Sequence, residues 1–284
     1  MLQQLEFTSQ RLRPWNPGSL VPEMLHLVTI ATHSERMFPV LQESAKRNGV
    51  SLTILGQEQP WENFSTKIDL LLPFCKTLPE EDILCYFDGF DSIILPAIHQ
   101  LESKFYSFDR DIVFSNDHQH SGTQGFFERK YFAGNTIFST GIFIGKVKTL
   151  SHLFSVIKEM YPDYSDDQKM IREYYTHHSP EHIGIDGKSK LFYNFDLSDG
   201  SFNLLNQVNC IDQGQIQLKN KEMPCIISFP CSWFAIGVTK NIHVLLKELG
   251  YDYYHEVNIK NTFNGLKHYI GTTIKDSLKS LLKI

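Results

Sequence analysis

The most informative stretch of this 284-residue chain reads Cys85-Tyr86-Phe87-Asp88-Gly89-Phe90-Asp91. Residues 83–87 are almost wholly apolar and predict a strand that is buried on both faces. Asp88 and Asp91 follow where that strand ends, and open α/β sheets bind their ligands beyond the carboxyl ends of the strands. Two carboxylates there suit a hard divalent cation that neutralises a departing diphosphate. The same pair is also typical of a turn or a helix N-cap, so both interpretations stay open.

The segments on either side of this stretch alternate between short apolar runs and runs with helical spacing. The expected strands cover residues 25–31, 50–55, 83–87 and 111–115, and the expected helices cover residues 37–48, 65–76 and 96–104. This alternation predicts an α/β fold with a mainly parallel sheet flanked by helices.

The chain divides into three expected parts: an irregular lead-in over residues 1–22, an α/β domain over 23–235, and a helical appendage over 236–284. Past residue 180 the alternation weakens, and the expected strands are at residues 190–194, 204–211 and 224–229. The last 22 residues interleave lysines with leucines and isoleucines. That pattern is typical of a helix that packs on a core with a solvated lysine face, and also of a helix that contacts a membrane surface.

The composition narrows the class of protein. With 42% hydrophobic and 21% charged residues, the chain is expected to be globular. A net charge of -5 gives no reason to expect a nucleic-acid partner. No apolar run approaches the roughly 18 residues that span a bilayer, and no secretory signal pattern is present. The five cysteines lack any CxxC spacing and predict reduced thiols, so a cytoplasmic protein is expected.

A second acidic motif is Asp166-Asp167-Gln168, which precedes a run with helical spacing. Two carboxylates at a helix start can simply complement the helix dipole. They can also bind sugar hydroxyls through charge-assisted hydrogen bonds. The residue pattern alone leaves both roles open.

Two further features carry weaker signals. Gly141 and Gly145 bracket an apolar run, which indicates either a close backbone approach to a ligand or a strand with a bulge at Gly141. His118 and His120 form an HxH pair without a third ligand at fitting spacing, and Asp117 at the end of the fourth strand is the better candidate.

In this order, the motifs resemble the glycosyltransferase domain of the procollagen lysyl hydroxylases and its stand-alone relatives. The matching segments are Leu27-Val28-Thr29-Ile30-Ala31-Thr32-His33, Leu55-Gly56, Trp61, Lys67, Phe87-Asp88-Gly89-Phe90-Asp91-Ser92-Ile93-Ile94-Leu95, Phe114-Ser115-Asn116-Asp117, Thr140-Gly141-Ile142-Phe143-Ile144-Gly145, Asp166-Asp167-Gln168 and Lys188-Ser189-Lys190-Leu191-Phe192-Tyr193-Asn194. They span about residues 25–195, and six of them in order are fairly specific.

The resemblance implies a GT-A-like fold and a transferase that moves a hexose, glucose or galactose, from a UDP-sugar with the help of Mn2+ or another divalent cation. The acceptor it implies is a hydroxyl on a protein or glycan, such as a hydroxylysine-linked one. It assigns Asp88 and Asp91 to the metal and Asp166 and Asp167 to catalysis. Nucleotide or diphosphate contacts are implied for Thr29, Thr32, Trp61, Lys67, Phe90 and Gly141.

Three departures from the family pattern stand out. Phe90 replaces a tyrosine, and Ser139 replaces an asparagine. The family's later metal-binding histidine would fall near Ile227-Ser228, where no histidine stands. The cation is then held by two aspartates, the diphosphate and water alone, or is bound weakly. A second hypothesis follows: a catalytically degenerate GT-A-like domain that binds a glycan or a protein partner.

Overall fold

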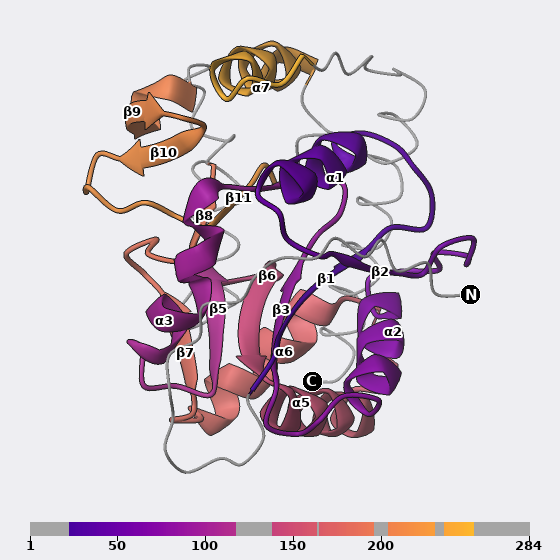
Figure 1. Cartoon of the computed structure of the whole chain (residues 1–284). Helices are drawn as coiled ribbons and strands as arrows, with labels where there is room; N and C mark the ends of the chain where they lie inside the picture. The colour runs from indigo at the N-terminus through magenta and orange to yellow at the C-terminus, as the bar shows by residue number, and fades with distance from the viewer. Residues whose placement is uncertain (1–22, 118–137, 164, 196–203, 231–235, 253–284) are drawn as a thin grey trace.

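The computed structural model describes residues 23–117, 138–163, 165–195, 204–230 and 236–252. A six-stranded sheet forms the centre of the protein (Figure 1). The strand order is β2-β1-β3-β6-β5-β7. The bounds are β1 Leu25–Ile30, β2 Thr53–Leu55, β3 Ile83–Phe87, β5 Ile112–Asn116, β6 Phe138–Lys146 and β7 Ile183–Asp186. Every strand runs parallel to the others except β6, which is antiparallel to β3 and β5. The predicted mixed and mainly parallel sheet of a GT-A-like fold is therefore confirmed.

Alternating side chains of the central strands enter two separate cores, as the period of two along a strand requires. One core receives Val28, Leu84, Tyr86, Ile112 and Phe114. The other receives Leu27, Ile83, Cys85, Phe87 and Val113.

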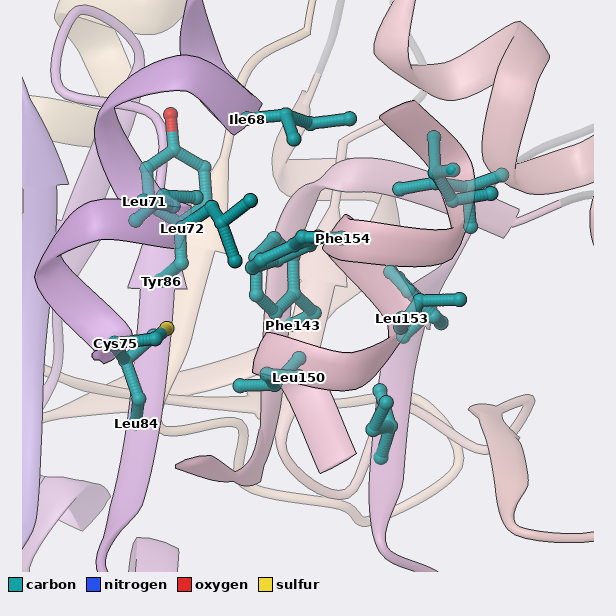
Figure 2. Close-up of a cluster of buried hydrophobic side chains, with 14 of the residues drawn as sticks. Ile68, Leu71, Leu72, Cys75, Leu84, Tyr86, Phe143, Leu150, Leu153 and Phe154 are labelled. Carbon is teal, nitrogen blue, oxygen red and sulfur yellow. The ribbon is translucent and has the colours of Figure 1, made fainter. Parts of the chain in front are cut away.

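Helices cover both faces of the sheet, as expected. The first core is covered by α2 Thr66–Cys75, α5 Val147–Met160 and α6 Asp167–His178. Figure 2 shows its centre, where Leu71 and Leu72 of α2 and Phe154 of α5 pack close to Tyr86 and Phe143. The second core is covered by α1 Phe38–Arg47, the 3-10 helix η1 Pro96–Gln100 and α3 Leu101–Tyr106.

A small second sheet lies beside the first, with the order β4-β11-β8. Its strands are β4 Ser92–Ile94, β8 Phe192–Asn194 and β11 Ile226–Ser228. Their side chains again alternate: Ile94 and Ile226 face the second core, whereas Ile93 and Ile227 face a third.

The third core contains side chains of α7 Ile236–Glu248 and of a hairpin, β9 Val208–Asp212 and β10 Gln215–Leu218. The strand expected over residues 204–211 is wrong in its first half, because the 3-10 helix η2 Leu204–Gln207 precedes β9 and buries Leu204 in this core. Leu245 and Leu246 of α7 also pack there, so the segment expected as an appendage begins with a helix held against the domain.

Several expectations lie outside the described residues: the lead-in over 1–22, His118 and His120, and the terminal helix over 263–284. Of the helices that the structure does describe, none is long and apolar enough to cross a membrane. The carboxyl ends of β1 and β3 and the start of the antiparallel β6 meet at one edge of the large sheet, and the Asp88-Gly89-Phe90-Asp91 turn is located there.

Candidate active site

A buried lysine connects the two acidic motifs. Lys67 Nζ lies 2.9 Å from Asp167 Oδ2 and 3.4 Å from Asp88 Oδ1, and it donates a 3.3 Å hydrogen bond to the carbonyl of Thr140. The Lys67 side chain is only 6% exposed, because it leaves the first turn of α2 beside the buried Ile68 and Leu71. An ammonium group has three N–H donors, and these three acceptors account for all of them.

The carboxylate of Asp88 is fixed from the strand that precedes it. Tyr86 lies two residues earlier in β3, on the same face, and its hydroxyl donates a 2.6 Å hydrogen bond to Asp88 Oδ1. The backbone N–H of Asp88 donates to the Gly141 carbonyl at 2.8 Å. Tyr86 and Lys67 therefore both contact the same oxygen of this carboxylate.

Gly141 leaves room for the Asp88 carboxylate in that arrangement. A Cβ added at Gly141 would lie 2.9 Å from Asp88 Oδ2, closer than real Cβ contacts come. The pairing of β5 with β6 also shifts here, from Phe114 opposite Phe143 to Ser115 opposite Ser139. The bulge that the two glycines allowed is present, and the close approach that Gly141 permits is to the Asp88 carboxylate.

Asp91 is held by the second sheet. Ser228 in β11 donates a hydrogen bond to Asp91 Oδ1 at 3.2 Å, and the Phe229 N–H donates to the Asp91 carbonyl at 2.9 Å. The segment Ile227-Ser228, where the family's metal-binding histidine would fall, therefore does lie against Asp91, and the Ser228 hydroxyl makes the contact.

The second acidic motif has two different environments. Asp166 is the N-cap of α6 and accepts a hydrogen bond from the Lys169 N–H at 3.0 Å. Asp167 is buried, and its Oδ2 accepts a 2.7 Å hydrogen bond from Thr140 Oγ1 as well as contacting Lys67. The capping interpretation is thus observed for Asp166, while Asp167 faces the other acidic motif through Lys67.

Burial and neighbouring charges shift the pKa values of several groups in the site. Burial and the like charge of Asp88 raise the pKa of Asp91 to about 7, although Ser228 and the Arg36 charge act in the opposite direction. Burial by itself lowers the pKa of Lys67, but the charges of Asp167 and Asp88 raise it above its ordinary value. Burial and the Asp88 charge raise the pKa of Tyr86, so its hydroxyl stays a neutral donor at neutral pH.

The remaining candidate nucleotide contacts lie in the strand ends and loops around this cluster. Thr29 is fully buried and its hydroxyl donates to the Phe87 carbonyl at 2.8 Å, inside the sheet. Thr32 follows β1, with its Oγ1 2.8 Å from His33 Nδ1. The Phe90 ring lies 5.5 Å from the His33 ring, between centroids.

Trp61 belongs to the loop between β2 and α2. It is 41% exposed and packs edge-on against Phe64, with 6.2 Å between ring centroids. The Ser65 N–H donates to the Ser165 carbonyl at 3.2 Å, which joins the end of this loop to the approach to α6. The structure brings Lys67, Gly141 and the acidic motifs into contact, whereas Trp61 lies on a neighbouring loop.

Four residues of the site were not predicted from the sequence: Tyr86, Thr140, Ser228 and Gln168, whose Oε1 accepts a 3.2 Å hydrogen bond from the Thr140 N–H. Tyr86 had a local signal, because a residue two positions before Asp88 on a strand shares its face. Thr140, Gln168 and Ser228 stood in segments that were compared with the family, but no role was assigned to them. Asp117 forms a 2.7 Å ion pair with Arg172 of α6 at the end of β5, so it is already paired with a side chain.

The donor chemistry suits a hard divalent cation. Asp88 and Asp91 are two carboxylates close enough for one to raise the pKa of the other, and oxygen ligands are those that Mg2+ and Mn2+ take. No group of three or more His, Cys, Asp or Glu residues in the described part of the chain could hold a metal by itself. The two aspartates therefore fit a cation whose other ligands come from substrate and water.

Comparison with known proteins gives one family. The family described as the PLOD GT domain matches residues 21–229. No curated protein matches the sequence. Among solved structures, the fold is similar to that of a glycosyltransferase involved in the glycosylation of the major capsid of PBCV-1. That similarity has a TM-score of 0.47 at 10% sequence identity and covers 78% of this chain and 98% of the other.

Proposed function

Because the chain belongs to the PLOD GT domain family of glycosyltransferases, we propose that it transfers a hexose from a UDP-sugar to a hydroxyl acceptor. The donor sugar is glucose or galactose, and the acceptor is a protein or glycan hydroxyl such as a hydroxylysine-linked one. The observation that carries this proposal is the buried contact of Lys67 with both Asp88 and Asp167, since it joins the two acidic motifs at the ligand-binding edge of the sheet.

Asp88 and Asp91 would hold Mn2+ at the diphosphate. When bound, such an ion neutralises the charge that develops on the leaving diphosphate. Tyr86 and Lys67 hold one oxygen of Asp88, and Ser228 holds one oxygen of Asp91, so both carboxylates are oriented before the donor arrives. Phe90 and Trp61 supply aromatic surface for the uracil base.

In the transfer, the bond from sugar C1 to the diphosphate oxygen breaks and its electron pair leaves with UDP. The acceptor oxygen bonds to C1 and loses its proton to water. Asp166 or Asp167 orients a sugar hydroxyl through a charge-assisted hydrogen bond, and its charge opposes the positive charge that develops on the ring. Thr140 and Lys67 keep Asp167 in one position, because both contact its Oδ2.

The experiment that tests this function is a donor screen. Wild-type protein is incubated with UDP-glucose, UDP-galactose and other UDP-sugars in the presence of Mn2+, and UDP release and acceptor products are measured by mass spectrometry, with EDTA as the control. We expect release of UDP from one hexose donor that EDTA abolishes. The Asp88→Asn/Asp91→Asn protein should release none, and equal release by this variant would contradict the proposal.

One observation favours a second candidate, a degenerate domain that binds a glycan or a partner without turnover. In the part of the chain that the structure describes, no third His, Cys, Asp or Glu joins Asp88 and Asp91. The same screen separates the two functions, because a binding module would bind UDP or a glycan in calorimetry and release no UDP from any donor. The cytoplasmic location and the membrane contact of the terminal helix remain predictions from the sequence.

A further inference from the structure

The loop between β1 and α1 contains an unusual backbone conformation. Arg36 has φ 49°, in the left-handed region that residues other than glycine, asparagine and aspartate rarely adopt. Residues held in such conformations cost free energy and gather at functional sites. The next residue, Met37, donates its N–H to the Phe90 carbonyl at 3.4 Å, so the loop is joined to the Asp88-Gly89-Phe90-Asp91 turn.

The Arg36 side chain lies beside that turn. Its guanidinium carbon is 6.0 Å from the centre of the Phe90 ring, and its Nε is 3.3 Å from a carboxylate oxygen of Glu35. The side chain is 29% exposed. A partly exposed cation therefore lies over the ring of Phe90, the residue that directly precedes Asp91.

Lys67 cannot fill the same role. Its three donors all have acceptors within the protein, and its side chain is 6% exposed. The positive charge of Lys67 offsets Asp88 and Asp167 rather than an incoming ligand. A diphosphate at this edge brings further negative charge, and a guanidinium fork matches phosphate oxygens better than any other cationic side chain.

We propose that Arg36 binds the diphosphate of the donor directly, and that the left-handed backbone at this position is what brings its guanidinium over the Phe90 ring, beside the Asp88-Gly89-Phe90-Asp91 turn. This inference rests on the proposed function, because it takes a nucleoside diphosphate as the ligand. It adds to that function a protein cation which contacts the donor independently of the metal ion.

The test compares ligands with and without the diphosphate. Binding of UDP, uridine and inorganic pyrophosphate to wild type, Arg36→Asn and Arg36→Lys is measured by calorimetry with Mn2+ present. Asparagine tolerates the left-handed conformation, so the thermal midpoint of Arg36→Asn should be unchanged. We expect Arg36→Asn to bind UDP and pyrophosphate about tenfold more weakly, the loss of one charge-assisted contact, and to bind uridine as wild type does. Arg36→Lys should lie between the two.

A matched control is Arg110→Asn, which removes the same charge from an exposed position just before β5, at the opposite edge of the sheet. It should bind all three ligands as wild type does. If Arg36→Asn loses affinity for UDP and for uridine equally, Arg36 only supports the Phe90 surface. If its affinities are unchanged, Arg36 does not contact the ligand. Either result overturns the inference.

If the wild type binds pyrophosphate but not UDP, only the proposed function is contradicted, and the affinities of wild type and Arg36→Asn for pyrophosphate still test whether Arg36 binds a diphosphate. Wild type that binds neither defeats both.

Discussion

Lys67 and Asp167 form a buried ion pair, with 2.9 Å between Nζ and Oδ2 and side chains that are 6% and 4% exposed. Because removal of one partner leaves an uncompensated buried charge, we expect Lys67→Met to lower the free energy of unfolding by about 3 kcal/mol or more. We also expect weaker UDP binding, since Asp88 and Asp167 then repel the diphosphate. Urea denaturation and calorimetry measure the two effects.

The control for Lys67 is Lys158→Met. Lys158 pairs with Asp69 at 2.5 Å, but both side chains are about half exposed, at 49% and 50%. Exposed pairs contribute at most about 1 kcal/mol, and the Lys158–Asp69 pair is exposed where the Lys67–Asp167 pair is buried. If Lys67→Met is no more costly than Lys158→Met and binds UDP normally, Lys67 is an ordinary helix residue.

Asp91 should make donor binding depend on a divalent cation. With Mn2+ present, we expect calorimetry to detect UDP binding to wild type, and we expect EDTA to abolish most of it. Asp91→Asn keeps the shape of the side chain and removes its charge, so it should lose the Mn2+-dependent part of the affinity. Binding that is indifferent to EDTA in wild type would remove the metal from the mechanism.

The Tyr86 hydroxyl should affect turnover more than folding. Tyr86→Phe deletes the 2.6 Å hydrogen bond to Asp88 and keeps the ring that stacks on Phe143 at 5.1 Å. We expect a loss of about 1 to 2 kcal/mol in stability and a fall in kcat at nearly constant KM for the acceptor. Tyr106→Phe, which deletes a hydroxyl contact with Glu23 at the surface, is the control and should leave kcat unchanged. A kcat unaltered in Tyr86→Phe would mean that Lys67 alone suffices to position Asp88.

The local pattern of apolar residues was enough to predict the strand that ends at Phe87 and the position of Asp88 beyond it, because neighbouring residues determine this pattern. The direction of β6 could not be predicted in that way, since a strand buried on both faces has the same apolar pattern whether it runs parallel or antiparallel to its neighbours. The contact between Ser228 and Asp91 spans 137 residues and depends on the pairing of β11 with β4, and no local signal reports such a pairing.

Lys67 shows a different limit of the sequence. The family resemblance predicts that Lys67 lies near the nucleotide or its diphosphate, and the structure shows it in contact with Asp88 and Asp167. That all three of its donors are used by protein acceptors could not be read from the sequence, because Thr140 enters the site only through the bulge in β6. The same bulge gives Gly141 its function beside Asp88, which the sequence left undecided between a ligand contact and a strand irregularity.

The last prediction separates the two carboxylates at the start of α6. Asp166→Asn should lower stability by no more than about 1 kcal/mol, since asparagine is nearly as good an N-cap as aspartate. Asp167→Asn keeps an oxygen near Lys67 and Thr140 but removes the charge. If at least one carboxylate acts on the donor sugar or the acceptor, at least one variant will still bind UDP and lose most of its turnover at a temperature where it is folded. Melting temperature, UDP affinity and kcat are therefore measured together for both variants. If instead both variants turn over normally at a temperature where they are folded, whatever their melting temperatures, the two aspartates serve the helix and the buried ion pair alone, and catalysis must be sought in other residues.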